Sequence, residues 1–122
     1  MLKKNWSDIR LSGNAATHEC QGIKIMSAYV VFTRESTEDS AELDTYMNTV
    51  APTFEGHPIK FLALYGKLDK LEGTGPEGIV ILEFPSMADA QAWYNSPSYQ
   101  AVAAHRHKGA TYRVTIVEGQ SP

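Results

Sequence analysis

The sequence predicts one α+β domain in which a four-stranded antiparallel sheet carries helices on one face only. Residues 79–84 are apolar at five of six positions, so a strand made of them must be covered on both faces. Strand and helix patterns follow one another along the chain as strand, helix, strand, strand, helix, strand. Two such strand-helix-strand units side by side, with right-handed crossovers, give this sheet.

The first unit begins with residues 28–33, whose β-branched and aromatic side chains are typical of a buried strand. A polar turn follows, and we expect Ser36 or Thr37 to cap the next helix. Apolar residues then recur at three- and four-residue steps over 43–54, which indicates one face of a helix. Pro52 should kink or restart that helix, because proline lacks the N–H that a helix interior needs.

Residues 58–66 alternate in a second strand that is largely apolar on both sides. The polar, glycine-rich stretch 67–78 is expected to be a hairpin connection into the strand 79–84. Ser86, followed by an acidic residue three positions on, predicts a helix over 86–95.

A short further helix should start at Ser96 and Pro97 and end at Gly109, because proline suits the first helical position and glycine the position after a helix. The last strand is expected over 111–117. Both helices would cover the same face of the sheet. Since the strands are apolar on both sides, we expect the bare face to meet that of a second copy in a two-fold homodimer.

Composition bounds the class of protein. The chain has 122 residues and a net charge of −3 with scattered basic residues, so nothing favours nucleic acid or an anionic membrane as a partner. Cys20 is the single cysteine, and no long apolar run follows the basic N-terminus, so we expect a cytoplasmic protein without an export signal or membrane span. Residues 1–25 are expected to be an arm or leader, 26–119 the domain, and 120–122 a tail.

The G-x-G-x-x-G pattern of residues 73–78 leads into a strand, so it predicts a hairpin loop and not a phosphate-binding loop. His105 and His107 lie about 200° apart around a helix and would not face one metal ion. No metal site and no cofactor are therefore predicted.

Several stretches together resemble a known family: Leu71-Glu72-Gly73, Glu83-Phe84-Pro85-Ser86, Ala92-Trp93-Tyr94 with Ser96 and Tyr99, Arg106, and Val117-Glu118-Gly119. They are similar to the domain of unknown function 1330 family, part of the dimeric α+β barrel superfamily. The resemblance covers about residues 27–119. It implies a ferredoxin-like protomer and a homodimer, and it implies no reaction. Relatives in the superfamily include cofactor-free monooxygenases, isomerases and haem-binding enzymes that use the cleft between sheet and helices. Residues 55–58 depart from the family, which more usually has a Gly-Gly pair there.

Arg106 is the most informative candidate residue, because its predicted helix face also carries apolar side chains. In one interpretation it binds a carboxylate or enolate at the mouth of the cleft, with Tyr94 or Tyr99 donating a hydrogen bond. In the other it pairs with Glu83, Glu72 or a helix C-terminus, and the tyrosines are core.

His57 and Glu83 are the candidate proton carriers, and Trp93 is a candidate wall of the cleft. Two functions therefore stay open. The first is a cofactor-independent enzyme that acts on a small organic substrate in the sheet-helix cleft. The second is a non-catalytic module that binds a small ligand or only holds a homodimer. An open cleft into which Arg106, Tyr99 and His57 converge would favour the enzyme. A cleft filled by Trp93, Phe54 and Met47 would favour the module.

Overall fold

A computed structural model describes residues 26–120 and confirms the predicted α+β fold. The expected arm, residues 1–25, lies outside the described residues, and so do the last two residues of the chain. In chain order the elements are β1 (Ala28–Thr37), α2 (Ser40–Thr49), the 3-10 helix η1 (Ala51–Phe54), β2 (Lys60–Leu64), β3 (Gly78–Phe84), α3 (Met87–Tyr94), α4 (Pro97–Gly109) and β4 (Ala110–Glu118).

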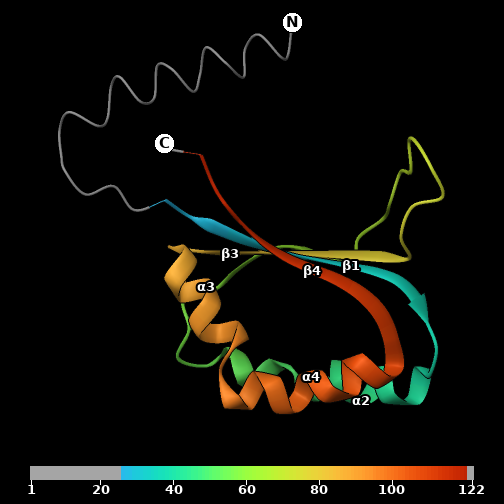
Figure 1. Cartoon of the computed structure of the whole chain (residues 1–122), viewed down its shortest axis with the longest axis horizontal. Coiled ribbons are helices and arrows are strands. Elements are labelled where there is room, and N and C mark those ends of the chain that lie inside the picture. Colours follow the sequence, from blue (N-terminus) through green and yellow to red (C-terminus); the bar gives the residue numbers. More distant parts are fainter. Residues whose placement is uncertain (1–25, 121–122) are drawn as a thin grey trace, which may run out of the picture.

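The four strands form one antiparallel sheet in the order β2-β3-β1-β4. This is the ferredoxin-like arrangement, in which β1 and β3 are central and β2 and β4 are edges. The helices lie together on one side of the sheet, and the connection between β2 and β3 projects on the other side (Figure 1). One face of the sheet is therefore covered by the helices, and the other carries no helix of residues 26–120.

β1 is longer than expected, because its last residues continue to pair with the start of β4 beyond a bulge after Arg34. The first helix consequently starts later. Its cap is Asp39, whose carboxylate accepts hydrogen bonds from the backbone N–H groups of Ala41 and Glu42 at 3.1 and 3.3 Å. The expectation that Ser36 or Thr37 caps it was wrong, because Thr37 is still part of the strand.

The other predicted helix starts are confirmed. The Ser86 hydroxyl accepts from the Asp89 N–H at 3.1 Å, and the Ser96 hydroxyl accepts from the Tyr99 N–H at 3.2 Å. Pro52 restarts the helix, as predicted: α2 ends before it and the 3-10 helix η1 follows. β2 is shorter than the predicted 58–66, and a bulge between Phe61 and Ala63 limits its pairing with β3 to four residues.

The core fills the space between the helices and the covered face of the sheet. Its largest fully buried side chains are Trp93, Tyr99, Phe84, Leu82 and Val30. They come from β1, β3 and the two later helices, so this layer joins the two strand-helix-strand units. Within residues 26–120 no helix has the length and apolar character of a membrane span.

The opposite face, which we call the open face, is apolar at its centre and polar at one edge. In register across β1 and β3, Val31 lies opposite Ile81, with Tyr29 and Thr33 on either side of Val31. On β4 the same face carries Thr111, Arg113, Thr115 and Val117, all of them exposed. The expectation of apolar residues on both sides therefore holds for the two central strands and was wrong for β4.

Candidate functional site

A cleft of about 490 Å³ lies between the covered face of the sheet and the helical segment α2-η1. The sheet contributes residues of β1, β2 and β3, and Trp93 of α3 is also part of the wall. The lining residues are Phe32, Tyr46, Met47, Val50, Ala51, Phe54, Phe61, Leu64, Tyr65, Val80, Leu82 and Trp93. Almost all of this surface is hydrocarbon, and Phe61 and Leu64 of the edge strand are 46% and 56% exposed.

Trp93 gives the cleft a rigid aromatic wall, as its place on the helix suggested. It is 1% exposed, and its ring stacks on Phe54 with centroids 5.6 Å apart. Its indole N–H donates to the hydroxyl of Thr53 at 3.3 Å, so the polar atom of this side chain is already used. Trp93 therefore supports the partly buried ring of Phe54 from behind and offers a ligand no free donor.

Two tyrosine hydroxyls are the polar groups of the lining. The Tyr46 hydroxyl is hydrogen-bonded to that of Tyr99 at 2.8 Å, and the Tyr65 hydroxyl to that of Tyr112 at 2.5 Å. Burial raises the pKa of Tyr46, Tyr65 and Tyr99, so these phenols keep their protons at neutral pH. In each pair one hydrogen is used between the partners, and the other hydrogen is not used within the pair.

Arg106 lies directly behind this aromatic lining. It is 3% exposed, and its guanidinium carbon is 5.0 Å from the ring centre of Tyr112, 5.5 Å from that of Phe32 and 5.9 Å from that of Tyr46. None of the ion pairs within residues 26–120 includes Arg106, and its buried Nε has no hydrogen-bond partner. The structure thus places a buried cation at the back of an apolar cleft.

Neither Glu83 nor Glu72, the two carboxylates predicted as partners, forms an ion pair with Arg106. Glu83 lies 4.0 Å from Lys60 instead, and Glu72 is an exposed residue of the β2-β3 connection. Arg106 does occupy the last turn of α4, where the helix dipole favours a positive charge. Burial and the charge of Arg106 both lower the pKa of the adjacent His107, whose Nε2 lies 3.4 Å from an Arg106 nitrogen.

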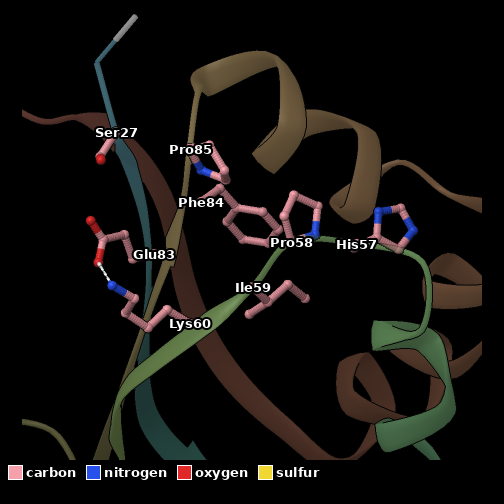
Figure 2. Close-up of a pocket in the computed structure, with 8 residues that line it drawn as sticks. All are labelled: Ser27, His57, Pro58, Ile59, Lys60, Glu83, Phe84 and Pro85. Carbon is pink, nitrogen blue, oxygen red and sulfur yellow. Dashed lines mark ion pairs between the residues drawn. The ribbon is translucent and has the colours of Figure 1, made fainter.

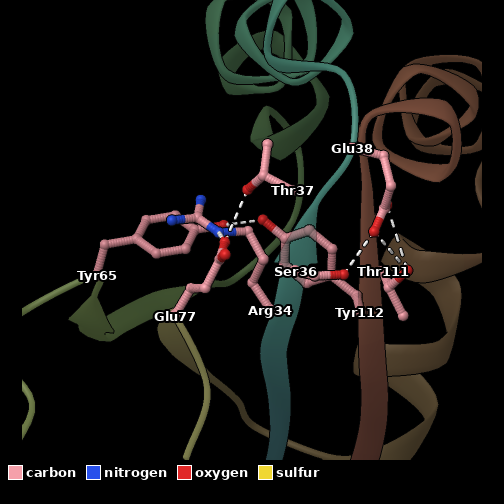
Figure 3. A network of polar contacts seen from close by, with 8 residues as sticks. All are labelled: Arg34, Ser36, Thr37, Glu38, Tyr65, Glu77, Thr111 and Tyr112. Carbon is pink, nitrogen blue, oxygen red and sulfur yellow. Dashed lines mark hydrogen bonds and ion pairs between the residues drawn. The ribbon is translucent and has the colours of Figure 1, made fainter.

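Tyr65 closes one end of the cleft in an unusual backbone conformation. Its φ of 54° is in the left-handed region, and its ring passes so close to Gly78 that a Cβ there would lie 2.6 Å from the ring. The guanidinium of Arg34 lies 5.1 Å from the ring centre and pairs with Glu77 at 3.1 Å (Figure 3). Glu77 also accepts a hydrogen bond from Thr37 at 2.7 Å. This network fixes the end of the β2-β3 connection to β1 and holds Tyr65 in place.

His57 and Glu83 lie outside the cleft, in a second hollow of about 480 Å³. Figure 2 shows Glu83 directed towards Lys60 and His57 on the far side of the hollow, beyond Pro58. The two predicted proton carriers therefore share a hollow without facing each other, and neither belongs to the lining of the cleft.

The remaining predicted residues are placed behind the cleft or on the surface. Tyr94 is half-buried, with its ring 5.4 Å from that of Tyr99, and neither belongs to the lining. His105 lies 2.7 Å from Glu42. Within residues 26–120 no three His, Cys, Asp or Glu side chains converge as a metal site would require.

Sequence reasoning missed Tyr46, Tyr65 and Tyr112. Each lies in a helix or strand pattern where a tyrosine counts as an apolar residue, so the pattern predicts no role for its hydroxyl. The available signal was that phenols recur on faces that are otherwise hydrocarbon, where each hydroxyl needs a partner. The G-x-G-x-x-G stretch lies in the β2-β3 connection and runs into β3, as expected of a hairpin loop.

Comparison with known proteins places the chain in a family. The model of the family described as "Domain of unknown function (DUF1330)" matches residues 27–120. No curated protein is significantly similar in sequence. The solved structures compared below are 12–19% identical to this chain, so they establish the fold alone.

A protein of unknown function from Rhodopseudomonas palustris has a TM-score of 0.61 at 15% identity, with 94% of each chain covered. A cofactor-independent oxygenase from Streptomyces nogalater has a TM-score of 0.55 at 12% identity, covering 80% of this chain and 96% of its own. A protein of the "ethyl tert-butyl ether d (ethd)" family from Bacillus halodurans has a TM-score of 0.54 at 19% identity, covering 78% of this chain and 100% of its own. Together they confirm the ferredoxin-like α+β fold, which this chain shares with distant proteins.

Proposed function

Because the chain belongs to the DUF1330 family, whose description assigns no reaction, we propose its function from the cleft: it is a cofactor-independent enzyme that binds a small, mostly apolar organic substrate there. The single observation that carries this proposal is an apolar cleft with tyrosine hydroxyls backed by a buried cation. Its volume of about 490 Å³ is within the range of small-molecule sites, roughly 300–1,000 Å³.

The lining favours a flat ligand. Phe54 and Phe61 present aromatic surface from two elements, with Trp93 stacked behind Phe54, and aromatic surfaces bind planar molecules through offset stacking and edge contacts. A ligand oxygen at the Tyr46 end would accept a hydrogen bond from a phenol that stays protonated. Such donors stabilise negative charge that develops on an oxygen, which is what proton removal from an organic substrate requires.

The oxygenase from Streptomyces nogalater supports the cofactor-independent class, since the same fold carries that kind of chemistry in a distant protein. One observation favours a different function, a non-catalytic binding module. The ionisable groups of the cleft lining are two tyrosines with raised pKa, and neither can act as a base at neutral pH. The two functions differ in whether a bound molecule is consumed.

Calorimetric titration with 4-nitroanisole, a flat and neutral probe, tests the cleft. Ala51 is exposed on the rim of the cleft, so Ala51→Trp should obstruct it and weaken binding about tenfold or more, because a filled apolar site has no surface left to bury. The matched control is Ala92→Trp, on the exposed side of α3 and outside the lining. Binding that survives Ala51→Trp unchanged would show that the probe sits elsewhere.

A chromatographic assay then separates the enzyme from the binding module. Small phenols, ketones and carboxylates that stabilise the wild-type protein against heat are incubated with it in air and without added cofactor. Consumption that disappears with Ala51→Trp supports the enzyme. Ligands that bind and are recovered unchanged would support the binding module.

We further propose that two copies associate through their open faces. Val31, Ile79 and Ile81 form an apolar centre on the two central strands, on the face that no helix of residues 26–120 covers. Val31→Asp should give a monomer by analytical ultracentrifugation, whereas Gln91→Asp on the exposed side of α3 should leave the dimer intact. A wild-type monomer at micromolar concentration would refute the dimer.

A proton-transfer role for His57 and Glu83 stays a prediction, and substitution of each residue tests it. Since both lie in the second hollow, His57→Gln and Glu83→Gln should leave the affinity of the cleft for 4-nitroanisole unchanged. If either substitution stops consumption of a substrate that still binds, that residue reaches the reacting atoms.

A further inference from the structure

We infer that the natural ligand of the cleft carries an acidic oxygen, as an ionised phenol, an enol or a carboxylate. Arg106 is its counter-ion, and the hydroxyl of Tyr46 lies between the two charges and donates to the ligand oxygen. This inference rests on the proposed function, because it names the class of molecule that the same cleft takes. It depends on a second observation, the charge behind the lining.

The first step is the charge balance around Arg106. A buried guanidinium is costly unless an anion or several acceptors compensate for the lost water. Arg106 is 3% exposed, no ion pair within residues 26–120 includes it, and its Nε has no acceptor. The site therefore lacks the negative charge that such a group normally has.

Several titratable groups face Arg106. They are Tyr46 from α2, Tyr65 after β2, Tyr94 from α3, Tyr99 and His107 from α4, and Tyr112 from β4. None is a carboxylate; burial raises the pKa of Tyr46 and Tyr99, while burial and Arg106 lower that of His107. The cluster thus holds one net positive charge.

Tyr46 connects this charge to the cleft. Tyr46 belongs to both, because it lines the cleft and its ring lies 5.9 Å from the guanidinium carbon. Its hydroxyl is bonded to that of Tyr99, so the pair can donate one hydrogen to a ligand oxygen while Arg106 stabilises negative charge there. A neutral ligand would contact the apolar walls and leave the positive charge of Arg106 without a counter-ion.

A purely structural role for Arg106 is the rival explanation. Three aromatic rings surround the guanidinium, and cation–π attraction offsets part of its desolvation. The rings are neutral, however, so they supply no charge that balances the guanidinium. The two explanations differ in whether the charge is felt inside the cleft.

The test compares 4-nitrophenol with its methyl ether, 4-nitroanisole. Both are flat and of similar size, but only the phenol ionises, near neutral pH, and its anion absorbs visible light. The pKa of the bound phenol is read from that absorbance with the protein in excess. We expect it to lie at least about one unit below the value in buffer, a tenfold change in the ionisation ratio, because a nearby cation favours the anion.

Arg106→Met should abolish this shift and leave 4-nitroanisole binding intact. Arg106→Lys should keep much of the shift, and Tyr46→Phe should weaken phenolate binding about tenfold, the value of one hydrogen bond to a charged group. The matched control is Arg113→Met, which removes an exposed cation from the open face.

The outcomes separate the two proposals. If neither probe binds, the proposed function of the cleft fails. If 4-nitroanisole binds and the phenol keeps its ordinary pKa in the wild-type protein, the cleft stands and the inference about its ligand is overturned. The wild-type measurement alone decides this, so the inference stays testable if Arg106→Met does not fold. A shift that Arg113→Met removes equally would also overturn it, because the effect would then come from net charge.

Discussion

The paired hydroxyls of Tyr46 and Tyr99 allow a quantitative test of the cluster beside Arg106. Tyr99 is fully buried and Tyr46 is 6% exposed, and their oxygens are 2.8 Å apart. Tyr99→Phe removes one partner and leaves the other hydroxyl buried without it. An unsatisfied buried hydroxyl costs about 1–3 kcal/mol, so each single substitution should lower the free energy of unfolding by roughly that amount.

The double variant Tyr46→Phe/Tyr99→Phe should recover part of the loss, because no unpaired hydroxyl then remains. We expect a coupling energy of about 1 kcal/mol between the two substitutions, within the range for residues in one hydrogen-bond network. Urea unfolding followed by circular dichroism measures it, and each kilocalorie corresponds to roughly 4–8 °C in Tm for a domain of this size. Strictly additive effects would show that the hydroxyls act independently and refute the coupled cluster.

Three further predictions concern the packing and charges around the cleft. Gly109→Ala should lower the free energy of unfolding by about 2–3 kcal/mol in urea titrations, because its Cβ would lie 2.6 Å from the backbone nitrogen of Leu43, and backbone cannot yield as a side chain can; an unchanged midpoint would contradict this contact. Gly78→Ala should cost about 1–3 kcal/mol by displacing the Tyr65 ring, and most of this loss should vanish in a Tyr65→Ala background. Finally, the lowered pKa of His107 means that the unfolded chain binds more protons just below the ordinary histidine value near 6.5, so stability should fall as pH drops through that window. His107→Gln should reduce this fall in Tm, and an identical pH profile would contradict it.

The fold could be predicted from the sequence because its signals are local and agree with one another. The apolar run 79–84 requires cover on two faces, and the hydroxyls of Ser86 and Ser96 mark helix starts independently of any tertiary contact. The error at Ser36 has a tertiary cause. Pairing with β4 extends β1 to Thr37, and no local propensity reveals that partner.

The candidate site was predictable only in part. Arg106 and Trp93 stand out because a charge or a large ring on a buried helix face needs an explanation. Tyr65 could not be found in this way, because its role depends on a left-handed backbone and on the absence of a side chain at Gly78. Both follow from how β2 and β3 are joined in space.

The separation of His57 from the cleft was not predictable either. The sequence places His57 at the start of a strand that does line the cleft, since Phe61 and Leu64 of β2 belong to its wall. The chain turns between Gly56 and the strand, and this turn puts the imidazole in the second hollow. Two or three residues of irregular backbone decide which hollow a side chain reaches.

Methyl NMR during a titration with 4-nitroanisole tests the central claim, that the cleft between sheet and helices binds small apolar molecules, most directly. The account predicts that the methyl signals of Met47, Val50 and Leu82, which line the cleft, shift in a saturable way. The signals of Val31 and Ile81 on the open face should stay where they are. Saturable shifts confined to the open face, or no shifts at all, would contradict the claim.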